Sequence, residues 1–305
     1  MKNFAITGVG GYIAPRHLQA IKDTGNNLIA ALDINDSVGI LDRYFPDTSF
    51  FTEFERFERH LEHLKRINHH EKVDYISICT PNFLHDSHIR LALRIGADAI
   101  CEKPLVLNPW NLDVLEDIEK ETGKRIYTIL QLRVHPSLIR LKEKIKNEIN
   151  QDKNKKYNVT LDYITARGKW YDFSWKGITE KSGGIATNIG IHLFDLLIWL
   201  FGMPVHSQVI LNEKRAMRGE LELEHAFVKW FLSINYSDLP LEVKSKQSTY
   251  RSIKIEGEEI EFTEGFTELH TEVYRRILNN EAGFNIPDAR PSIELVYRIR
   301  NNIKF

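Results

Sequence analysis

The sequence predicts an α/β protein of two domains, an N-terminal one with a doubly wound parallel sheet and a C-terminal α+β one with a large open, mostly antiparallel sheet. Short apolar strands alternate with helical segments through the first 132 residues, the pattern of successive βαβ units. After a polar linker at 150–156, the strands are longer and alternate apolar with polar residues, which is typical of an antiparallel sheet with one exposed face. We therefore predict domains at 1–132 and 133–305.

Composition indicates a soluble globular chain, with 305 residues of which 42% are apolar and 27% charged. The net charge of -1 argues against nucleic acid as a partner. The apolar run at 193–201 is short and contains Asp195, so we expect no membrane insertion, and the first strand at residue 4 follows no export signal. The two cysteines, Cys79 and Cys101, lie in apolar runs and read as buried reduced thiols of a cytoplasmic protein.

The first unit of the chain has the order strand, glycine turn, helix, strand and acid. A strand at 4–7 precedes Gly8 and Gly10, a helix is expected at 15–23, and Asp33 closes the next strand. Gly8 permits a tight turn, and Gly10 lets the backbone approach a pyrophosphate at the helix N-terminus. Asp33 can accept hydrogen bonds from both ribose hydroxyls of NAD and would repel the 2′-phosphate of NADP. The pattern predicts a Rossmann domain that binds NAD.

This fingerprint is incomplete, because Ile13 and Ala14 stand where its third glycine would be. The alternative is an ordinary turn after a strand. The turn residues assigned to cofactor binding are Gly8, Gly10, Gly11, Tyr12 and Ile13.

Two further strands end in residues that suit the same crevice. The strand at 73–79 is followed by Thr80, Asn82 and a helix that His85 opens, and the strand at 97–101 is followed by Glu102 and Lys103 before a proline. The carboxyl ends of parallel strands border the ligand crevice, so Lys103 can face a bound cofactor. The alternative is an ordinary surface charge pair at a strand terminus. Beyond it we expect a helix at 109–122 and a strand at 125–132.

The helical stretch at 53–72 carries four histidines, His60, His63, His69 and His70. No cysteine or carboxylate completes a known ligand set, so we expect a solvated helix and no metal site.

The second half is expected to contain three helices and several strands. The predicted helices are 137–149, 267–278 and 291–303. The predicted strands are 157–165, 205–211 and 222–235, with a hairpin of 251–255 and 259–262 around Gly257.

Within this half, Asn188, His192 and Asp195 follow a Gly-Gly turn and are spaced four and three residues apart. On a helix they would share one face. The ordinary interpretation is a packed or hydrogen-bonded core histidine. An amide at position 188 can orient a sugar hydroxyl but cannot take its proton.

The segment 165–176 concentrates cations and aromatic rings. Arg167, Lys169 and Lys176 suit phosphate or carboxylate, whereas aromatic rings suit the faces of sugars and bases. The rings are Trp170, Tyr171 and Trp175. The alternative is a loop that folds over its own aromatic side chains.

Three of these motifs together resemble the glucose-fructose oxidoreductase, inositol dehydrogenase and MocA (Gfo/Idh/MocA) family. They are the glycine turn with Asp33, the Thr80-Pro81-Asn82 stretch with His85, and Glu102-Lys103-Pro104. The resemblance implies that Lys103 reaches the active site and that the bond to Pro104 is commonly cis. It also implies a catalytic role for His192, with an acid or amide four residues earlier.

Within that family, the chain resembles the UDP-N-acetyl-2-amino-2-deoxyglucuronate 3-dehydrogenases of the WlbA/WbpB type. The stretches that carry this likeness are 11–17, 130–133, 165–176, 188–192 and 249–253. The resemblance implies NAD-dependent oxidation at C3 of a UDP-sugar uronate for surface-polysaccharide (O-antigen) synthesis, in a cytoplasmic homotetramer built on the open sheet. A separate PLP aminotransferase would use the 3-keto product. Gln131 and Arg133 would line the crevice.

The site predicted in this way has a cofactor part and a substrate part. Cofactor binding is assigned to the turn residues and to Asp33, Thr80, Asn82, His85, Glu102, Lys103 and Gln131. Substrate binding is assigned to Lys103, Arg133, Arg167, Lys169, Trp170, Tyr171, Trp175, Lys176, Asn188 and His192.

Proton transfer is assigned jointly to Lys103 and His192. A lysine has an ordinary pKa of about 10.4, which a positive nicotinamide would lower, and a histidine has one of about 6.5. Two other functions stay open. One is a related dehydrogenase that acts on another sugar or polyol, such as UDP-GlcNAc or inositol, and the other is a non-catalytic NAD-binding sensor.

Overall fold

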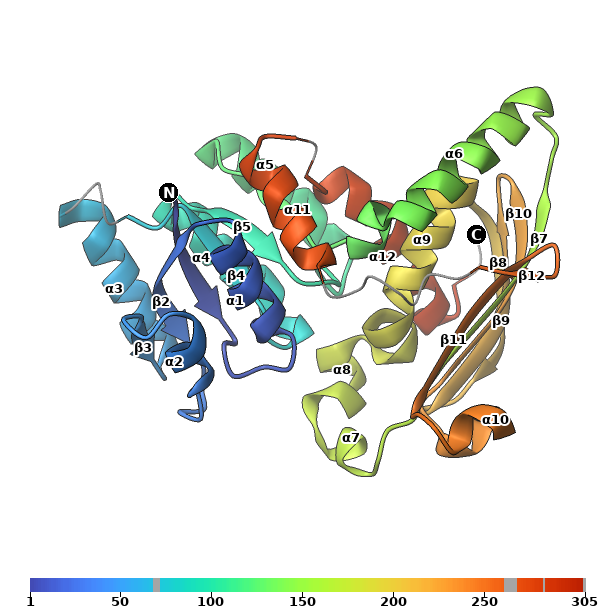
Figure 1. Ribbon diagram of the computed structural model, residues 1–305, viewed down its shortest axis with the longest axis horizontal. Helices are drawn as coiled ribbons and strands as arrows, with labels where there is room; N and C mark the ends of the chain where they lie inside the picture. Colours follow the sequence, from blue (N-terminus) through green and yellow to red (C-terminus); the bar gives the residue numbers. More distant parts are fainter. Residues whose placement is uncertain (68–71, 261–267, 282, 304–305) are drawn as a thin grey trace. The chain divides into compact units, whose positions relative to one another are not determined.

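The computed structural model describes residues 1–305 except 68–71, 261–267, 282 and 304–305 (Figure 1). The chain folds into two compact units. The first comprises Met1–Val106, Trp110–Gln131 and Phe266–Ala289, and the second comprises Leu107–Pro109, Leu132–Gly265 and Arg290–Phe305. The division at 131/132 lies one residue from the predicted boundary, but the single boundary did not anticipate that 266–289 folds with the first unit.

The first unit contains a six-stranded sheet in which every pair is parallel, as predicted. Its strand order is β3-β2-β1-β4-β5-β6. The central strands are buried on both faces, which explains their continuous apolar sequences. The strands are β1 (Asn3–Thr7), β2 (Asn27–Leu32), β3 (Ser49–Phe51), β4 (Tyr75–Ile78), β5 (Asp98–Cys101) and β6 (Ile126–Thr128).

The helices of this unit form two groups. In one group, α1 packs with α2 and α11. In the other, α4 packs with α3 and α5 (Figure 1). This is the layered arrangement of a doubly wound fold. The bounds are α1 (Ala14–Asp23), α2 (Ile40–Tyr44), α3 (Phe54–Ile67), α4 (His85–Ile95), α5 (Trp110–Thr122) and α11 (Leu269–Leu278), with a 3₁₀ turn η1 (Asn82–Leu84). A second 3₁₀ turn, η2 (Gln131–Val134), begins at the last residue of the segment Trp110–Gln131 and continues into the second unit.

A buried carboxylate, Glu102, joins these elements where β5 ends. His17 of α1 and His270 of α11 each donate from Nε2 to its Oε1 at 3.0 Å. The amide of Lys103 donates to Oε2 at 3.2 Å. Burial opposes the charged form, but the hydrogen bonds from the two imidazoles outweigh it, so the pKa of Glu102 lies well below its usual range. Glu102 is therefore an ionised acceptor held by three donors.

The network continues through α11 to the centre of the sheet. His17 Nδ1 lies 2.7 Å from the hydroxyl of Tyr274, which lies 2.6 Å from Oγ of Ser77 on β4. Because Nε2 of His17 donates to a carboxylate, a neutral ring accepts from Tyr274 at Nδ1. The position of α11 in the first unit thus has a polar cause as well as an apolar one.

The second unit contains a six-stranded mixed sheet of order β12-β11-β7-β10-β9-β8. Among the described strands, β10 and β7 pair in parallel and the other pairs are antiparallel, so the predicted open and mostly antiparallel sheet is confirmed. The strands are β7 (Tyr157–Thr165), β8 (Pro204–Asn212), β9 (Ala216–Leu223), β10 (Ala226–Ser233), β11 (Thr249–Ile255) and β12 (Glu258–Glu259).

The single strand predicted at 222–235 is wrong. The chain reverses at Glu224 and His225, and β9 and β10 pair across this two-residue turn with Leu223 opposite Ala226. The turn residues are not the glycine or asparagine that usually mark a tight hairpin. Apolar residues also recur in the same strand-like manner on both sides of the turn. Nothing local in the sequence therefore marked the reversal.

The helices of this unit differ widely in length. They include α6 (Pro136–Gln151), α9 (Ile191–Phe201), α10 (Leu241–Lys244) and most of α12 (Ile286–Asn301). The α12 helix begins five residues before the predicted helix at 291 and contains Pro291 in its interior. Short helices α7 (Trp170–Phe173) and α8 (Thr179–Ser182), a 3₁₀ turn η3 (Trp175–Gly177) and a π-helical turn η4 (Ala186–Gly190) precede α9. Another 3₁₀ turn, η5 (Tyr236–Asp238), follows β10.

The α9 helix is the core helix of the second unit. It lies beside α6 (Figure 1), and Phe194 packs edge-on against Trp230 of β10 with ring centroids 5.4 Å apart. Gly190 permits the close approach, because a Cβ there would lie 2.6 Å from Leu232. By length and composition the helical run Thr179–Phe201 would pass for a membrane span, but 78% of its apolar window is buried, as in a core helix.

Some predicted features fall outside the described residues. They are His69 and His70, the hairpin strand beyond residue 260 and the first residue of the helix predicted at 267–278. Cys79 and Cys101 are buried and unbonded, as expected.

We predict that Glu102→Gln destabilises the first unit by about 3 kcal/mol, because the amide presents only one acceptor oxygen to three donors. Urea unfolding followed by circular dichroism measures the change. The wild-type pKa of Glu102 is depressed in the folded state, so the difference should be complete above the unfolded pKa of about 4.5 and shrink as pH falls below it. A difference independent of pH from 3 to 7, roughly the range spanning that titration, would contradict an ionised Glu102.

Candidate functional site

The glycine turn of the first unit is built for close backbone contact. Gly8 has a φ of 79°, and a Cβ there would lie 2.7 Å from the backbone of Cys79 and Thr80. The amide of Gly11 donates to the carbonyl of Gly8 at 3.0 Å. Tyr12, in the same turn, is 90% exposed. The turn therefore lies directly against the end of β4, with no space for a side chain at its first glycine.

Asp33 lies across this turn at the end of β2. Its Oδ2 accepts the amide of Gly10 at 2.9 Å, and its Oδ1 accepts the amide of Asn35 at 3.0 Å. A Cβ on Gly10 would lie 3.2 Å from the carboxylate. The structure thus brings together the turn and the acid that the sequence predicted to hold a dinucleotide.

Two buried polar atoms at strand ends in this unit also suit a ligand. Thr80 Oγ1, after β4, and Gln131 Oε1, after β6, have no hydrogen-bond partner among the described residues. Such atoms are normally satisfied by protein, water or a ligand. Together with the glycine turn and Asp33, they fit an NAD molecule at the carboxyl edge of the sheet.

His85 has a structural position between two strand ends. Nδ1 lies 2.7 Å from the carbonyl of Pro104 and Nε2 lies 2.9 Å from the carbonyl of Thr80. Burial lowers the pKa of His85, and the two carbonyl contacts oppose this shift. The ring therefore connects the Thr80 and Lys103 segments. Asn82, in η1, is buried beside it.

Lys103 is half-buried, and its peptide bond to Pro104 is cis, as the family resemblance implied. The preceding side chain, Glu102, points into the core of the first unit, where its two oxygens accept three hydrogen bonds. His17, Glu102 and His270 have ligand atoms within 4.8 Å of one another, which is the spacing of a metal site. Hydrogen bonds account for all these contacts, so the geometry does not require an ion.

Arg133 makes a buried ion pair that the sequence did not reveal. Its Nε donates to Asp195 Oδ2 at 2.9 Å and its Nη2 donates to Oδ1 at 2.7 Å. This two-point contact joins η2 to α9 within the second unit. The structure thus uses at least part of the Arg133 guanidinium to anchor the core helix.

Asn188 and His192 lie where the backbone changes from π-helical to α-helical. The predicted regular helix is therefore interrupted between these two residues by a wider turn with i→i+5 hydrogen bonds. Asn188 Nδ2 donates to the hydroxyl of Tyr171 at 2.9 Å, and the ring of His192 packs edge-on against Tyr163 with centroids 5.5 Å apart. Such interruptions of a helix occur frequently at functional sites.

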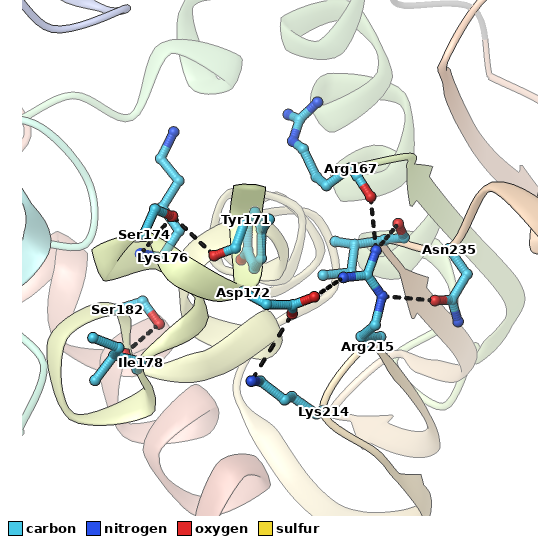
Figure 2. Close-up of polar contacts among 11 residues, drawn as sticks. Arg167, Tyr171, Asp172, Ser174, Lys176, Ile178, Ser182, Lys214, Arg215 and Asn235 are labelled. Carbon is cyan, nitrogen blue, oxygen red and sulfur yellow. Dashed lines mark hydrogen bonds and ion pairs between the residues drawn. The ribbon is translucent and has the colours of Figure 1, made fainter. Parts of the chain in front are cut away.

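The loop predicted to bind substrate folds as α7 and η3, and Figure 2 shows several of its side chains. Tyr171 is buried, Trp170 is 55% exposed, and their rings meet edge-on at 5.9 Å. Trp175 is half-buried and Lys169 is exposed. The loop does fold over some of its own aromatic rings, but the rings also support its cations.

Two of those cations, Arg167 and Lys176, point to the same side of the loop in Figure 2 and have no acidic partner among the described residues. The Lys176 amine lies 5.6 Å from the ring centroids of both Trp170 and Trp175. Burial, and then repulsion by Arg167, lower the pKa of Lys176. Two neighbouring cations without a carboxylate form a site for an anion.

A cavity of about 130 Å³ adjoins this loop within the second unit. Its lining includes Tyr171, Lys176, Lys214 and Arg300, together with Gly184 and Ile185 just before the Asn188 turn. The cavity therefore has the loop on one side and the helix that carries Asn188 and His192 on another.

One residue important to this site was absent from the sequence predictions. Arg215, just before β9, binds the loop through Asp172 and the carbonyl of Arg167 (Figure 2). Its only sequence signal is an arginine at the start of a strand, which does not distinguish it from a surface charge.

The two residues assigned to proton transfer lie in different units. Lys103 belongs to the first unit, and His192 belongs to the second.

Comparison with known proteins agrees with the fold and the motifs. Residues 2–130 match the model of the Gfo/Idh/MocA oxidoreductase family's NAD-binding Rossmann fold, and residues 146–304 match that of its C-terminal alpha/beta domain. A curated relative, D-glucoside 3-dehydrogenase of Escherichia coli, is 28% identical over 45% of this chain. The chain spans about four tenths of the length of this relative and of the next one, at 38% and 37%.

Solved structures give a match over nearly the whole chain. The WlbA (WbpB) dehydrogenase of Thermus thermophilus in complex with NAD and alpha-ketoglutarate is 52% identical, with a TM-score of 0.93 over 98% of this chain and 95% of that one. The same dehydrogenase in complex with NAD and UDP-GlcNAcA is 51% identical, with a TM-score of 0.92 over the same shares. The two domain matches, in the order and places that the fold predicts, show that this chain belongs to the Gfo/Idh/MocA family of oxidoreductases.

Proposed function

We propose that this protein is an NAD-dependent dehydrogenase that oxidises the C3 hydroxyl of UDP-N-acetyl-glucosaminuronic acid to the 3-keto sugar. The observation that carries the proposal is the end-to-end similarity, at 51% identity, to a dehydrogenase in complex with NAD and UDP-GlcNAcA. The glycine turn with Asp33 supports the cofactor, and the cationic aromatic loop supports the nucleotide sugar.

The residues divide into three roles. The turn from Gly8 to Ile13, Asp33, Thr80 and Gln131 hold NAD, which when bound accepts the hydride from C3. Lys103 and His192 jointly receive the proton of the C3 hydroxyl, and Asn188 orients that hydroxyl. The products are the ketone, NADH and one proton.

The substrate's negative charges meet the second unit. Arg167 and Lys176 bind the diphosphate or the uronate carboxylate, because they are adjacent cations that no acidic side chain neutralises among the described residues. Lys169, Trp170 and Trp175 surround the same region and supply a further cation and flat faces for the sugar and base.

A related dehydrogenase acting on UDP-GlcNAc, inositol or another polyol is the second candidate. Solved myo-inositol dehydrogenases share the fold, with a TM-score of 0.78 at 16% identity for that of Lactobacillus plantarum. The paired cations favour a charged substrate over a neutral polyol. A non-catalytic NAD sensor is the third candidate, and the presence of both Lys103 and His192 argues against it.

The wider setting of this activity is also part of the proposal. We place the protein in the cytoplasm as a homotetramer built on the open sheet of the second unit, where Ile210 and Phe227 are 58% and 49% exposed. The 3-keto product would pass to a PLP-dependent aminotransferase, which converts ketones to amines, in O-antigen synthesis.

The central test mixes the protein with NAD and one of UDP-GlcNAcA, UDP-GlcNAc, inositol or glucose, and follows NADH absorbance. We expect reduction only with UDP-GlcNAcA, and adding 2-oxoglutarate should reveal turnover that tightly held NADH would otherwise mask. Lys103→Ala and His192→Ala should each lower kcat by about 10²-fold or more. Reduction of NAD with inositol or glucose, and none with UDP-GlcNAcA, would show that the proposed substrate is wrong.

We also predict that Asp33→Asn weakens NAD binding by about tenfold and improves NADP binding, because the variant loses the carboxylate that accepts ribose hydroxyls and repels the 2′-phosphate. Fluorescence titration with NADH and NADPH measures both. Asp36→Asn, a change at a neighbouring exposed acid, is the control and should alter neither. Unchanged affinities in Asp33→Asn would remove that residue from the cofactor site.

A further inference from the structure

The guanidinium of Arg215 is bound on three sides within the second unit (Figure 2). Nη1 donates to Asp172 Oδ2 at 2.7 Å, and Nε donates to Asn235 Oδ1 at 3.0 Å. Nη2 donates to the carbonyl of Arg167 at 2.7 Å and to that of Ile234 at 3.3 Å. Only 28% of the side chain is exposed, so these bonds are partly protected from water.

These contacts join the sheet to the cationic loop. Ile234 and Asn235 follow the end of β10, whereas Arg167 and Asp172 lie at the start and the middle of the loop. The loop itself is compact, because a Cβ on Gly177 would lie 2.6 Å from the backbone of Tyr171 and Asp172. The contacts of Arg215 that fix Asp172 and Arg167 therefore also fix the segment up to Lys176.

The same loop reaches the helix that carries the proposed substrate residues. Tyr171 adjoins Asp172 in α7, and its hydroxyl accepts the amide of Asn188 at 2.9 Å. Burial raises the pKa of Tyr171, so its hydroxyl remains protonated at neutral pH. A continuous set of bonds thus runs from Arg215 through Asp172 and Tyr171 to Asn188.

Arg215 differs from Arg167 and Lys176 in having an acidic partner. Asp172 neutralises Arg215 at 2.7 Å, and exposed Lys214 lies 3.9 Å from the same carboxylate. Arg167 and Lys176 have no such acid among the described residues. Arg215 is thus fixed by the protein itself, whereas the positive charges that it helps to place are left for an anion.

We propose that Arg215 is a positioning residue that fixes the substrate loop, so that Arg167, Lys176 and, through Tyr171, Asn188 are already in place before the nucleotide sugar binds. The choice of substrate rests on the function proposed above. Arginine is required because a lysine cannot present several N–H donors in a plane to a carboxylate, an amide and two carbonyls. A prearranged loop improves binding because less conformational entropy is lost when the ligand arrives.

The kinetic test compares Arg215→Met and Arg215→Lys with the wild type. Arg215→Met should raise KM for UDP-GlcNAcA about tenfold or more, with kcat within about threefold, because charge-assisted bonds that order the loop are lost. Arg215→Lys should be intermediate. Arg90→Met is the matched control, because Arg90 makes a two-point ion pair with Asp86 in the first unit, at 2.8 and 3.2 Å.

A second readout does not depend on turnover. Hydrogen exchange of the amides at 171–177 should be at least about fivefold faster in Arg215→Met than in the wild type, because the loop opens more often. Asp172→Asn should have the same effects. The double variant should raise KM little beyond either single change, since both remove one arrangement.

Several outcomes would overturn the proposal. One is an unchanged KM together with unchanged exchange at 171–177, and another is a fall in kcat alone. If Arg215→Met does not fold, Asp172→Asn decides by the same two measurements. A wild type that does not oxidise UDP-GlcNAcA would refute the proposed function, whereas the exchange rates would still test whether Arg215 orders the loop.

Discussion

The first unit depends on the burial of one ionised carboxylate. Removing Glu102 from water is unfavourable unless donors replace the lost hydration, and two imidazoles and a backbone amide do so. Those donors come from α1, from α11 and from the Lys103 segment. The charge therefore stabilises only a structure in which a helix from near the C-terminus returns to the N-terminal domain, where Tyr274 continues the network to β4.

In the second unit, the presence or absence of an acidic partner separates the cations that hold the fold from those proposed to bind substrate. Arg133 is paired with Asp195, and Arg215 is paired with Asp172, so both arginines act largely within the protein. Burial lowers the pKa of Lys176, and charge repulsion by the neighbouring Arg167 lowers it further. Because such repulsion is unfavourable in the folded protein, an anion that relieves it gains binding free energy. The protein thus neutralises Arg215 with Asp172 and leaves Arg167 and Lys176 without an acidic partner among the described residues.

Local patterns were sufficient for the doubly wound domain. The glycine turn, Asp33 and the strand ends at Thr80 and Lys103 follow from rules that involve a few adjacent residues, and the structure has them at one sheet edge. Other features were less accessible. The turn at Glu224 and His225 has no strong signal, and Pro291 suggested a helix start although the helix begins at Ile286. In both places, packing of the surrounding elements overrides weak local preference.

The sequence by itself determined the order of the elements, the NAD-binding motif and the types of residue in the substrate loop, because these depend on spacing along the chain. Only the tertiary structure decided which charges are free. It paired Arg133 with Asp195 and Arg215 with Asp172, and it enclosed Glu102 between His17 and His270. The partners in these contacts are separated by 43 to 168 residues. The physical reason is that an ionisable side chain is defined by its neighbours in space, which local spacing does not encode.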